Sequence, residues 1–565
     1  MLSMNLPPSQ PSGQSDPVPV TLRTWPERLP WGALAVLLGS LLYLLLYYRL
    51  PLSNADEGII ATGAERILRG QVPYRDFFSE LGPASFYFQA WIFRVSGMNV
   101  TSLRLTAWII GGGLSLLLYL LARRVVHGTD AFLPSLIFTM ICYPYTYRVS
   151  HHAWGNAFFL LSVLCLSYLA FRPANENAAR LRVLAFAAGL AAAVALLAMQ
   201  SKGAWAVAMG VVFLALSEGF PAGNTFTAGL RRSLGWILWF ILGAGAVIGL
   251  AALYFTLQGA LGAWVEDNVI FLFANYRPYL DVPQASPWSV IGHLGQLAIL
   301  QPSVHLVLNI IGYLFFLLIA PGIAFGYTFW RVFLVRSREA EQTRLWLLLL
   351  LQGLGAYFGE LHSPDDFHLL SAAPIMLILL VHTWRCALSS SWSWRRPLRV
   401  VAWLGLLLMC FTGLRKAADT SKINVPVLTR RGTIYAQAQE APELQHVVNT
   451  IQNTVPSGGE TFFFPYHAEL YFLTSTYNPT RYDVLLADFH TVRQTDEAIS
   501  TLQAKRPAHI FDLTRRLPWT IRPHFPDDQP DVLGPHRVER VLLAPMNLYT
   551  PASEVADMQV WALRR

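Results

Sequence analysis

Two adjacent carboxylates, Asp56 and Glu57, stand directly after the first long apolar run of the chain. A carboxylate within hydrogen-bond reach of a hydroxyl can accept its proton, so the pair is a candidate for general base catalysis. Neighbouring helical residues point about 100° apart, so we expect one of the pair to face a substrate and the other to support it. Burial at the membrane surface is expected to raise the carboxylate pKa. The structural alternative is that both acids occupy the first turn of a helix capped by Asn54.

Basic side chains on the same parts of the chain could bind a phosphate group. Arg148 and Lys202 each stand almost alone at the end of an apolar run, whereas Arg75 and Arg277 lie in longer connecting segments. Snorkelling of these side chains toward lipid headgroups is the alternative interpretation. We expect Arg148 and Lys202 to be the main phosphate ligands.

Histidines and further acids gather in two short segments. His151 and His152 form one, and the other is the run His-Ser-Pro-Asp-Asp-Phe-His over 362–368. These groups could bind a sugar or acceptor, could hold a divalent metal, or could form a plain polar loop in which Asp365 or Asp366 caps the next helix. We predict no metal and no other cofactor. The candidate substrate-binding residues are Arg75, Asp76, Arg148, His151, His152, Lys202, Arg277, His362, Asp365, Asp366 and His368.

The composition predicts that a lipid bilayer surrounds most of this chain. Of the 565 residues, 54% are hydrophobic and only 13% are charged, whereas soluble proteins carry about 25% charged residues. A spanning helix needs about 20 mostly apolar residues. About eleven such runs occur, near 31–50, 103–122, 131–147, 154–171, 183–200, 203–219, 234–256, 304–330, 345–360, 368–384 and 400–414. The expected fold class is an α-helical polytopic membrane protein. No nucleic-acid motif accompanies the net charge of +8.

Arginines recur in alternate short loops, and the positive-inside rule places those loops in the cytoplasm. This pattern places the N-terminus in the cytoplasm. Residues 1–30 are rich in Pro, Ser and Gln, which predicts disorder. The apolar run that follows is expected to be an uncleaved signal anchor.

The arginine pattern predicts a transmembrane domain over 31–414 with a long first outer loop over 51–102. Amphipathic patterns in that loop predict two helices, over 56–69 and 83–95. Residues 415–565 are then extracytoplasmic. The expected location is the plasma (inner) membrane.

The tail differs from the rest of the chain in its pattern. Helical patterns occupy 441–455 and 496–504, and short apolar runs predict strands at 461–464, 510–513 and 538–543. We therefore expect a small C-terminal α/β domain.

Three sequence runs of the first outer loop carry a family resemblance. They are Asn-Ala-Asp-Glu-Gly over 54–58, Arg-Gly-Gln-Val-Pro-Tyr-Arg-Asp-Phe over 69–77 and Gly-Pro-Ala-Ser-Phe-Tyr over 82–87. With the predicted architecture, they resemble the GT-C-fold glycosyltransferases of the family 39 type, near the protein O-mannosyltransferases and the lipid A aminoarabinose transferases. The resemblance implies a polyprenyl-phosphate sugar donor and a lipid, glycan or protein acceptor. It also implies an acidic pair in the first outer loop, of which the leading acid, Asp56, faces the substrate.

The expected function is therefore that of a hexosyl or pentosyl transferase. It would transfer sugar with inversion to an acceptor hydroxyl on the outer face, with Asp56 and Glu57 as base or positioning carboxylates. Alternatives are a transporter or flippase for a lipid-linked glycan and a non-catalytic scaffold. Span interiors almost free of ionisable residues disfavour transport, and the acidic first loop disfavours a scaffold.

Overall fold

The computed structural model describes residues 31–52, 54–171, 177–218, 226–276, 310–335, 340–362, 365–389, 395–486, 489–516, 538–543 and 548–564. The predicted N-terminal segment 1–30 and Arg277 lie outside these ranges. The long helices are α1 (Trp31–Leu44), α4 (Val100–Ala122), α7 (His151–Ala170), α8 (Ala178–Ala198), α9 (Gln200–Ser217), α10 (Phe226–Leu257), α16 (Ala340–Glu360), α17 (Asp366–Ser389) and α18 (Arg395–Ile423).

Within the described residues, six helices are long and apolar enough to cross a membrane by length and composition. Five of them fall in α4, α7, α8, α10 and α17, and the sixth is Ile310–Val335, which contains α15 (Ala320–Phe329). The chain is therefore a multi-pass helical membrane protein. The total of eleven spans stays a prediction.

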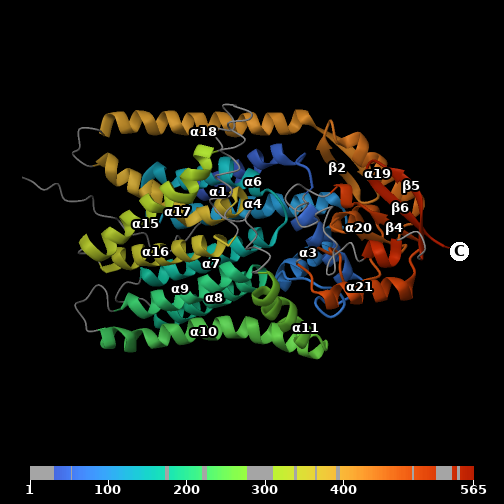
Figure 1. Cartoon of the computed structure of the whole chain (residues 1–565). Coiled ribbons are helices and arrows are strands. Elements are labelled where there is room, and N and C mark those ends of the chain that lie inside the picture. The colour runs from blue at the N-terminus through green and yellow to red at the C-terminus, as the bar shows by residue number, and fades with distance from the viewer. Residues whose placement is uncertain are drawn as a thin grey trace, which may run out of the picture.

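The helices form a bundle in which α8 packs against both α7 and α10, and α9 packs against α16. Figure 1 shows the long helices lying side by side, with the strands gathered beyond one end of the bundle. The predicted span at 131–147 is a series of short helical segments, α5 (Leu133–Ile137), η4 (Phe138–Cys142) and α6 (Tyr143–Thr146). An extended turn follows, and Ser150 caps α7 by accepting a hydrogen bond from the Ala153 amide at 3.1 Å.

The loop over 51–102 contains the helices η2 (Asn54–Gly58), α2 (Ile59–Leu68) and α3 (Pro83–Ser96). The predicted helical patterns at both places are thus helices. Gly82 anchors the connection between them, because a Cβ there would lie 2.2 Å from the Leu197 carbonyl oxygen. The loop over 69–82 is therefore held against the end of α8.

The tail contains a hairpin of β1 (Asn424–Thr429) and β2 (Gly432–Gln437), and a four-stranded sheet. The sheet has the order β3 (Phe462–Phe464), β4 (His509–Asp512), β6 (Met558–Leu563) and β5 (Tyr549–Val555), with only β3 and β4 parallel. Helices α19 (Ala441–Thr454), α20 (Ala468–Thr474) and α21 (Val492–Lys505) accompany it. The small C-terminal α/β fold is thus present.

One predicted strand is wrong. Residues 538–543 are not a strand, because Glu539–Leu543 forms a helical turn, η12. Val538, Leu542 and Leu543 are buried. Adjacent side chains such as Leu542 and Leu543 would point to opposite faces of a strand, whereas this turn buries both of them.

A buried joint connects the tail to the first loop. The guanidinium of Arg66 lies 2.6 Å from the Asp483 carboxylate and donates to the Thr480 carbonyl at 2.7 Å. The Thr62 hydroxyl donates to the Ala468 carbonyl at 2.8 Å. At Gly58, a Cβ would lie 2.8 Å from the main-chain nitrogen of Glu469. The tail therefore packs directly on the turn that carries the acidic pair.

Candidate functional site

Asp56 lies in the short helix η2, immediately after the first long helix and its η1 turn (Leu45–Tyr47). Its carboxylate is 16% exposed and has an arginine and a histidine as neighbours. Nη1 of Arg148 lies 3.5 Å from Oδ2, and Nδ1 of His151 lies 3.5 Å from Oδ1. Both distances are long for a close ion pair. Asp56 is therefore only loosely paired and partly accessible.

The electrostatics of Asp56 differ from the expectation. Burial acts to raise the pKa of the Asp56 carboxyl, but the interaction with His151 and the charge of Arg148 hold the pKa well below its usual range. The expected rise in pKa is therefore wrong for the chain without substrate, because nearby cations outweigh desolvation. A carboxylate with such a low pKa is ionised at neutral pH and is a weak proton acceptor.

Glu57 points into a different environment. Its carboxylate is fully buried and lies 3.0 Å from Nη1 of Arg104, which is itself 2% exposed. The Val149 amide also donates to Glu57 at 3.3 Å, and Nη2 of Arg104 donates to the Leu50 carbonyl at 2.8 Å. The pair thus has one accessible member and one sealed member, the arrangement expected from helical geometry.

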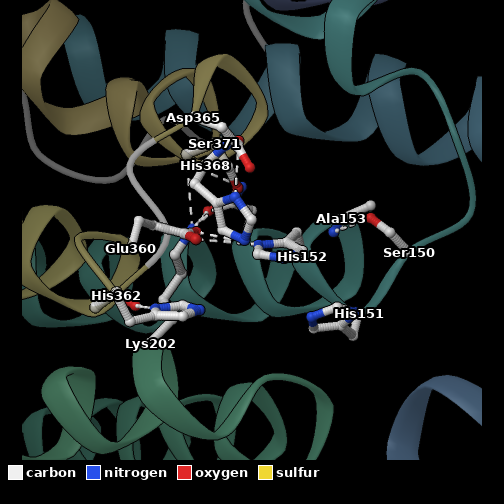
Figure 2. Close-up of polar contacts among 12 residues, drawn as sticks. Ser150, His151, His152, Ala153, Lys202, Glu360, His362, Asp365, His368 and Ser371 are labelled. Atoms are coloured by element: carbon white, nitrogen blue, oxygen red, sulfur yellow. Dashed lines mark hydrogen bonds and ion pairs between the residues drawn. The ribbon is translucent and has the colours of Figure 1, made fainter. Parts of the chain in front are cut away.

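Lys202 lies at the centre of a second group of polar side chains, shown in Figure 2. Its ammonium is fully buried, 2.6 Å from Oε1 of Glu360. It also donates to Oδ1 of Asn156 at 2.6 Å and to the Ser371 carbonyl at 3.1 Å. Three elements meet here, since α7, α9 and α16 supply Asn156, Lys202 and Glu360. Lys202 therefore already has a complete set of partners, and its expected contact with phosphate stays a prediction.

A row of histidines connects the two groups. The rings of His151 and His152 are 4.1 Å apart, and those of His152 and His368 are 4.8 Å apart. Nδ1 of His152 lies 3.2 Å from Oε2 of Glu360. The His362 ring lies 5.3 Å from that of His368. We call Asp56, Arg148, His151, His152, Lys202, Glu360, His362, Asp365 and His368 the polar cluster.

The loop over 362–368 belongs to this cluster through His368. Oδ1 of Asp365 lies 2.8 Å from Nδ1 of His368 and accepts a hydrogen bond from the His368 amide at 2.9 Å. Asp365 therefore also caps α17, which was one of the alternatives predicted from the sequence. Figure 2 shows Asp365 and His368 above Glu360 and His152.

His152, Glu360 and His368 form a group whose ligand atoms lie within 4.8 Å of one another and could hold a metal ion. The Lys202 ammonium, however, contacts the same carboxylate at 2.6 Å. A positive charge at that position disfavours a second cation on Glu360.

Other predicted residues lie apart from the cluster. Arg75 and Asp76 pair with each other at 2.8 Å, and Nη1 of Arg75 donates to the Gln258 carbonyl at 2.7 Å. Asp366 is the first residue of α17, and its charge acts on Lys416 of α18. The placement of Arg75 suits holding a loop to the end of α10.

Two carboxylates of this region are absent from the sequence-based set. Glu360 ends a predicted span and precedes His362 by two residues, which was a usable signal. Glu80 is half-buried in the first loop, and burial raises the pKa of its carboxyl, with His151 and Asp56 as charged neighbours. The Gln200 side chain fixes this place by donating to the Glu80 carbonyl at 2.6 Å. The position of Glu80 just before the run over 82–87 could have indicated that it belongs to this region.

Comparison with known proteins rests on structure, because no family model and no curated protein sequence matches the chain. ArnT from Cupriavidus metallidurans, solved bound to undecaprenyl phosphate, matches with a TM-score of 0.54 and 11% identity over 94% of this chain and 98% of ArnT. The oligosaccharyltransferase AglB from Archaeoglobus fulgidus, solved with an inhibitory peptide and a dolichol-phosphate, matches with a TM-score of 0.51 and 13% identity. That match covers 86% of this chain and 70% of AglB. Both are membrane glycosyltransferases of one fold class, and the chain therefore has the GT-C fold that its sequence predicted.

Proposed function

We propose that this protein transfers a sugar from a polyprenyl-phosphate donor to an acceptor hydroxyl at the outer face of the membrane. The observation that carries the proposal is the accessible Asp56 carboxylate, held between Arg148 and His151 at the turn after the first long helix. Support also comes from the fold, since ArnT and AglB were solved with undecaprenyl phosphate and dolichol-phosphate.

Arg148 is the proposed ligand of the donor phosphate. Its side chain is 29% exposed and lies over the Phe367 ring at 4.5 Å, so it can turn a guanidinium face toward a lipid headgroup. A guanidinium binds phosphate through charge-assisted hydrogen bonds. Arg75 and Arg277 stay weaker proposals for the same role.

Donor binding would also change Asp56. A phosphate beside Arg148 adds negative charge and offsets the cation that helps to lower the pKa of the Asp56 carboxyl. The pKa then rises, so Asp56 becomes a better base only when the donor is present. In one inverting step, the acceptor oxygen bonds to the anomeric carbon as the bond from that carbon to the phosphate oxygen breaks. The hydroxyl proton passes to Asp56, and the phosphate leaves with the electron pair.

Glu57 and Lys202 are proposed as positioning residues. Glu57 and Arg104 fix the turn that aims Asp56, through the contacts to Val149 and Leu50. Lys202 holds Glu360, which lies beside His152. The remaining members of the cluster, His151, His362, Asp365 and His368, are proposed to bind sugar or acceptor hydroxyls.

The proposed arrangement in the membrane follows from the same contacts. The joint between Arg66 and Asp483 supports one side for the first loop over 51–102 and the tail over 415–565. The arginine-rich loops support the outer side for both. A phosphatase reporter after residue 565 should be active, and one at residue 127 should be inactive. Phosphatase activity at residue 127 would contradict the proposed topology.

The decisive experiment uses the purified full chain in liposomes with a panel of radiolabelled polyprenyl-phosphate sugars and of lipid, glycan and protein acceptors. The readouts are label on the acceptor and release of free polyprenyl phosphate. One donor should be consumed, and Asp56→Asn should lower turnover by roughly 10²–10⁴-fold, because an amide cannot accept the proton. The matched control is Asp419→Asn, an exposed carboxylate on α18 that pairs with Arg415. If the lipid-linked sugar crosses the bilayer and no polyprenyl phosphate is released, the protein is a flippase and the transferase proposal fails.

A further inference from the structure

A separate cavity of about 250 Å³ lies between the segment that follows α10 and the C-terminal domain. One wall comes from α11 (Leu261–Val265) and η5 (Glu266–Ile270), and the other comes from the 481–482 turn and α21. We call it the loop–domain pocket. The residues that line it and carry the argument are Glu266, Asp267, Arg481, Tyr482, Arg493 and Glu497.

Charges of both signs line this pocket. Nη1 of Arg481 lies 3.3 Å from Glu497, and Nη2 of Arg493 lies 3.2 Å from Glu266. Nη2 of Arg481 also lies 3.7 Å from Oδ2 of Asp267. The lining contains three carboxyl groups and two guanidiniums, so it has no excess of positive charge for a phosphate or another anion.

Asp267 gives an independent sign of a ligand. Its side chain is 5% exposed, and its Oδ2 accepts no hydrogen bond from any residue that the structure describes. A buried carboxylate oxygen without a donor costs free energy, and such atoms call for a specific explanation. A hydrogen-bond donor bound in the pocket would satisfy it.

A sugar ring fits these features together. Its hydroxyls donate to carboxylates and accept from guanidiniums, so one ring can use both signs of charge. The volume is below the usual range for drug-sized ligands, which suits a single ring. Tyr482 offers a fixed phenol edge, because its hydroxyl donates to Oε2 of Glu497 at 2.8 Å.

The pocket is also coupled to the first loop. Arg481 donates from its side chain to the Tyr74 carbonyl, and its own carbonyl accepts from the Phe78 amide at 2.9 Å. Asn268, next to Asp267, donates to the Ser79 carbonyl at 3.2 Å. The stretch so held leads directly to Glu80, whose carboxyl interacts electrostatically with Asp56.

We propose that the loop–domain pocket binds one uncharged sugar residue of a glycan acceptor. The proposal rests on the proposed function and names the acceptor class. The donor sugar is tethered through its phosphate to the bilayer beside Arg148, whereas this pocket is built from the C-terminal domain and a segment outside the candidate spans. An acceptor that reaches in from outside meets it first.

Saturation-transfer NMR on the full chain in nanodiscs tests the proposal, with free methyl glycosides of hexoses and N-acetylhexosamines as the probes. At least one glycoside should bind with a Kd on the order of 1 mM. Arg493→Ala and Glu497→Ala should weaken that binding tenfold or more. Arg493 is 79% exposed, so its replacement leaves folding intact. Glu554→Gln, an exposed carboxylate of the same domain paired with Arg515, is the matched control and should bind normally.

Three outcomes would overturn the pocket: no glycoside binds, the pocket variants bind as well as the control, or the polyprenyl-phosphate sugar displaces the glycoside. The last outcome would identify the ligand as the donor sugar. Asp56→Asn should abolish transfer and leave glycoside binding unchanged. Glycoside binding in a protein without any transferase activity would uphold the pocket and overturn the proposed function, and transfer without glycoside binding would do the reverse.

Discussion

The joint between the first loop and the tail and the Asp56 end of the polar cluster both bury charges, but they pair them differently. In the joint, Arg66 and Asp483 lie 2.6 Å apart with side chains 6% and 9% exposed. In the cluster, Asp56 lies 3.5 Å from both Arg148 and His151 and is 16% exposed. Close, fully buried pairs hold segments together, whereas longer and more accessible pairs can rearrange when a ligand binds. The difference separates contacts that hold the fold from those that the proposed reaction could use.

Breaking the joint should have the largest effect on stability. Asp483→Ala leaves Arg66 buried without its carboxylate, which should lower the free energy of unfolding by about 3–5 kcal/mol. Glu554→Ala is the matched control, because Arg515 contacts Glu554 at the same 2.6 Å but with both side chains exposed. The control should cost about 1 kcal/mol or less. Denaturant unfolding measures both losses. An equal loss of unfolding free energy in the two variants would show that the buried pair stabilises the protein no more than the exposed pair does.

Lys202 should behave like the joint rather than like Arg148. Both Lys202 and Glu360 are fully buried, so Lys202→Met strands a carboxylate and should also destabilise the fold by about 3–5 kcal/mol. The double change Lys202→Met with Glu360→Leu should recover most of that stability. A folded Lys202→Met protein with a raised KM for donor and unchanged stability would return Lys202 to the phosphate site.

Arg148→Ala should show the opposite separation. Loss of a charge-assisted contact to phosphate should raise KM for the donor tenfold or more, on the order of 1.5–3 kcal/mol. Thermal unfolding should stay close to that of the unmodified chain, because Arg148 is 29% exposed and its contact to Asp56 is long. Donor kinetics that match the unmodified chain would remove Arg148 from the site.

A smaller effect should appear with pH at the loop–domain pocket. Burial raises the pKa of Asp267 from 3.8 to about 7, with Arg481 acting against it. A raised acid pKa gives stability that is complete below the unfolded pKa and is lost as pH rises through about 7. Between about pH 5 and about pH 8 the chain should lose roughly 2–3 kcal/mol, and Asp267→Asn should lose less. Parallel pH profiles for the two proteins, measured by thermal unfolding, would contradict this cause.

The smallest expected effect is that of metal removal. The Lys202 ammonium already contacts Glu360, a member of the group that could hold a metal ion. Dialysis against a chelator should therefore leave the transfer rate unchanged. Loss of rate that a divalent cation restores would assign a metal to His152, Glu360 and His368.

Features set by local sequence were predictable. The divergence of Asp56 and Glu57 follows from helical geometry, and the first-loop helices follow from their periodicity. Pairings across long sequence separations were not. Glu57 meets Arg104 across 47 residues, and His152 meets Glu360 across 208, and no local pattern encodes those partners.

Helix ends were also hard to place. The apolar pattern of the last predicted span stops at 414, yet α18 continues to Ile423. The helix continues because hydrophobicity and helicity are separate properties, and the pair Arg415–Asp419, four residues apart, supports its polar end. The β1–β2 hairpin follows at once and was not predicted. The low pKa of Asp56 was likewise missed, because His151 and Arg148, which lower it, are more than 90 residues away in the sequence.

The joint also sets an order of events during synthesis. Arg66 and Asp483 are 417 residues apart in the chain, and ribosomes add roughly 5–20 residues per second. The turn that carries Asp56 and Glu57 is therefore synthesised about 20–80 s before Asp483 is. During that interval Arg66 has no carboxylate from the tail, and Gly58 has no helix α20 against it. A nascent or truncated chain should thus be more easily cleaved by proteases in its first loop. The first loop gains its full set of contacts only after the C-terminal domain has been synthesised.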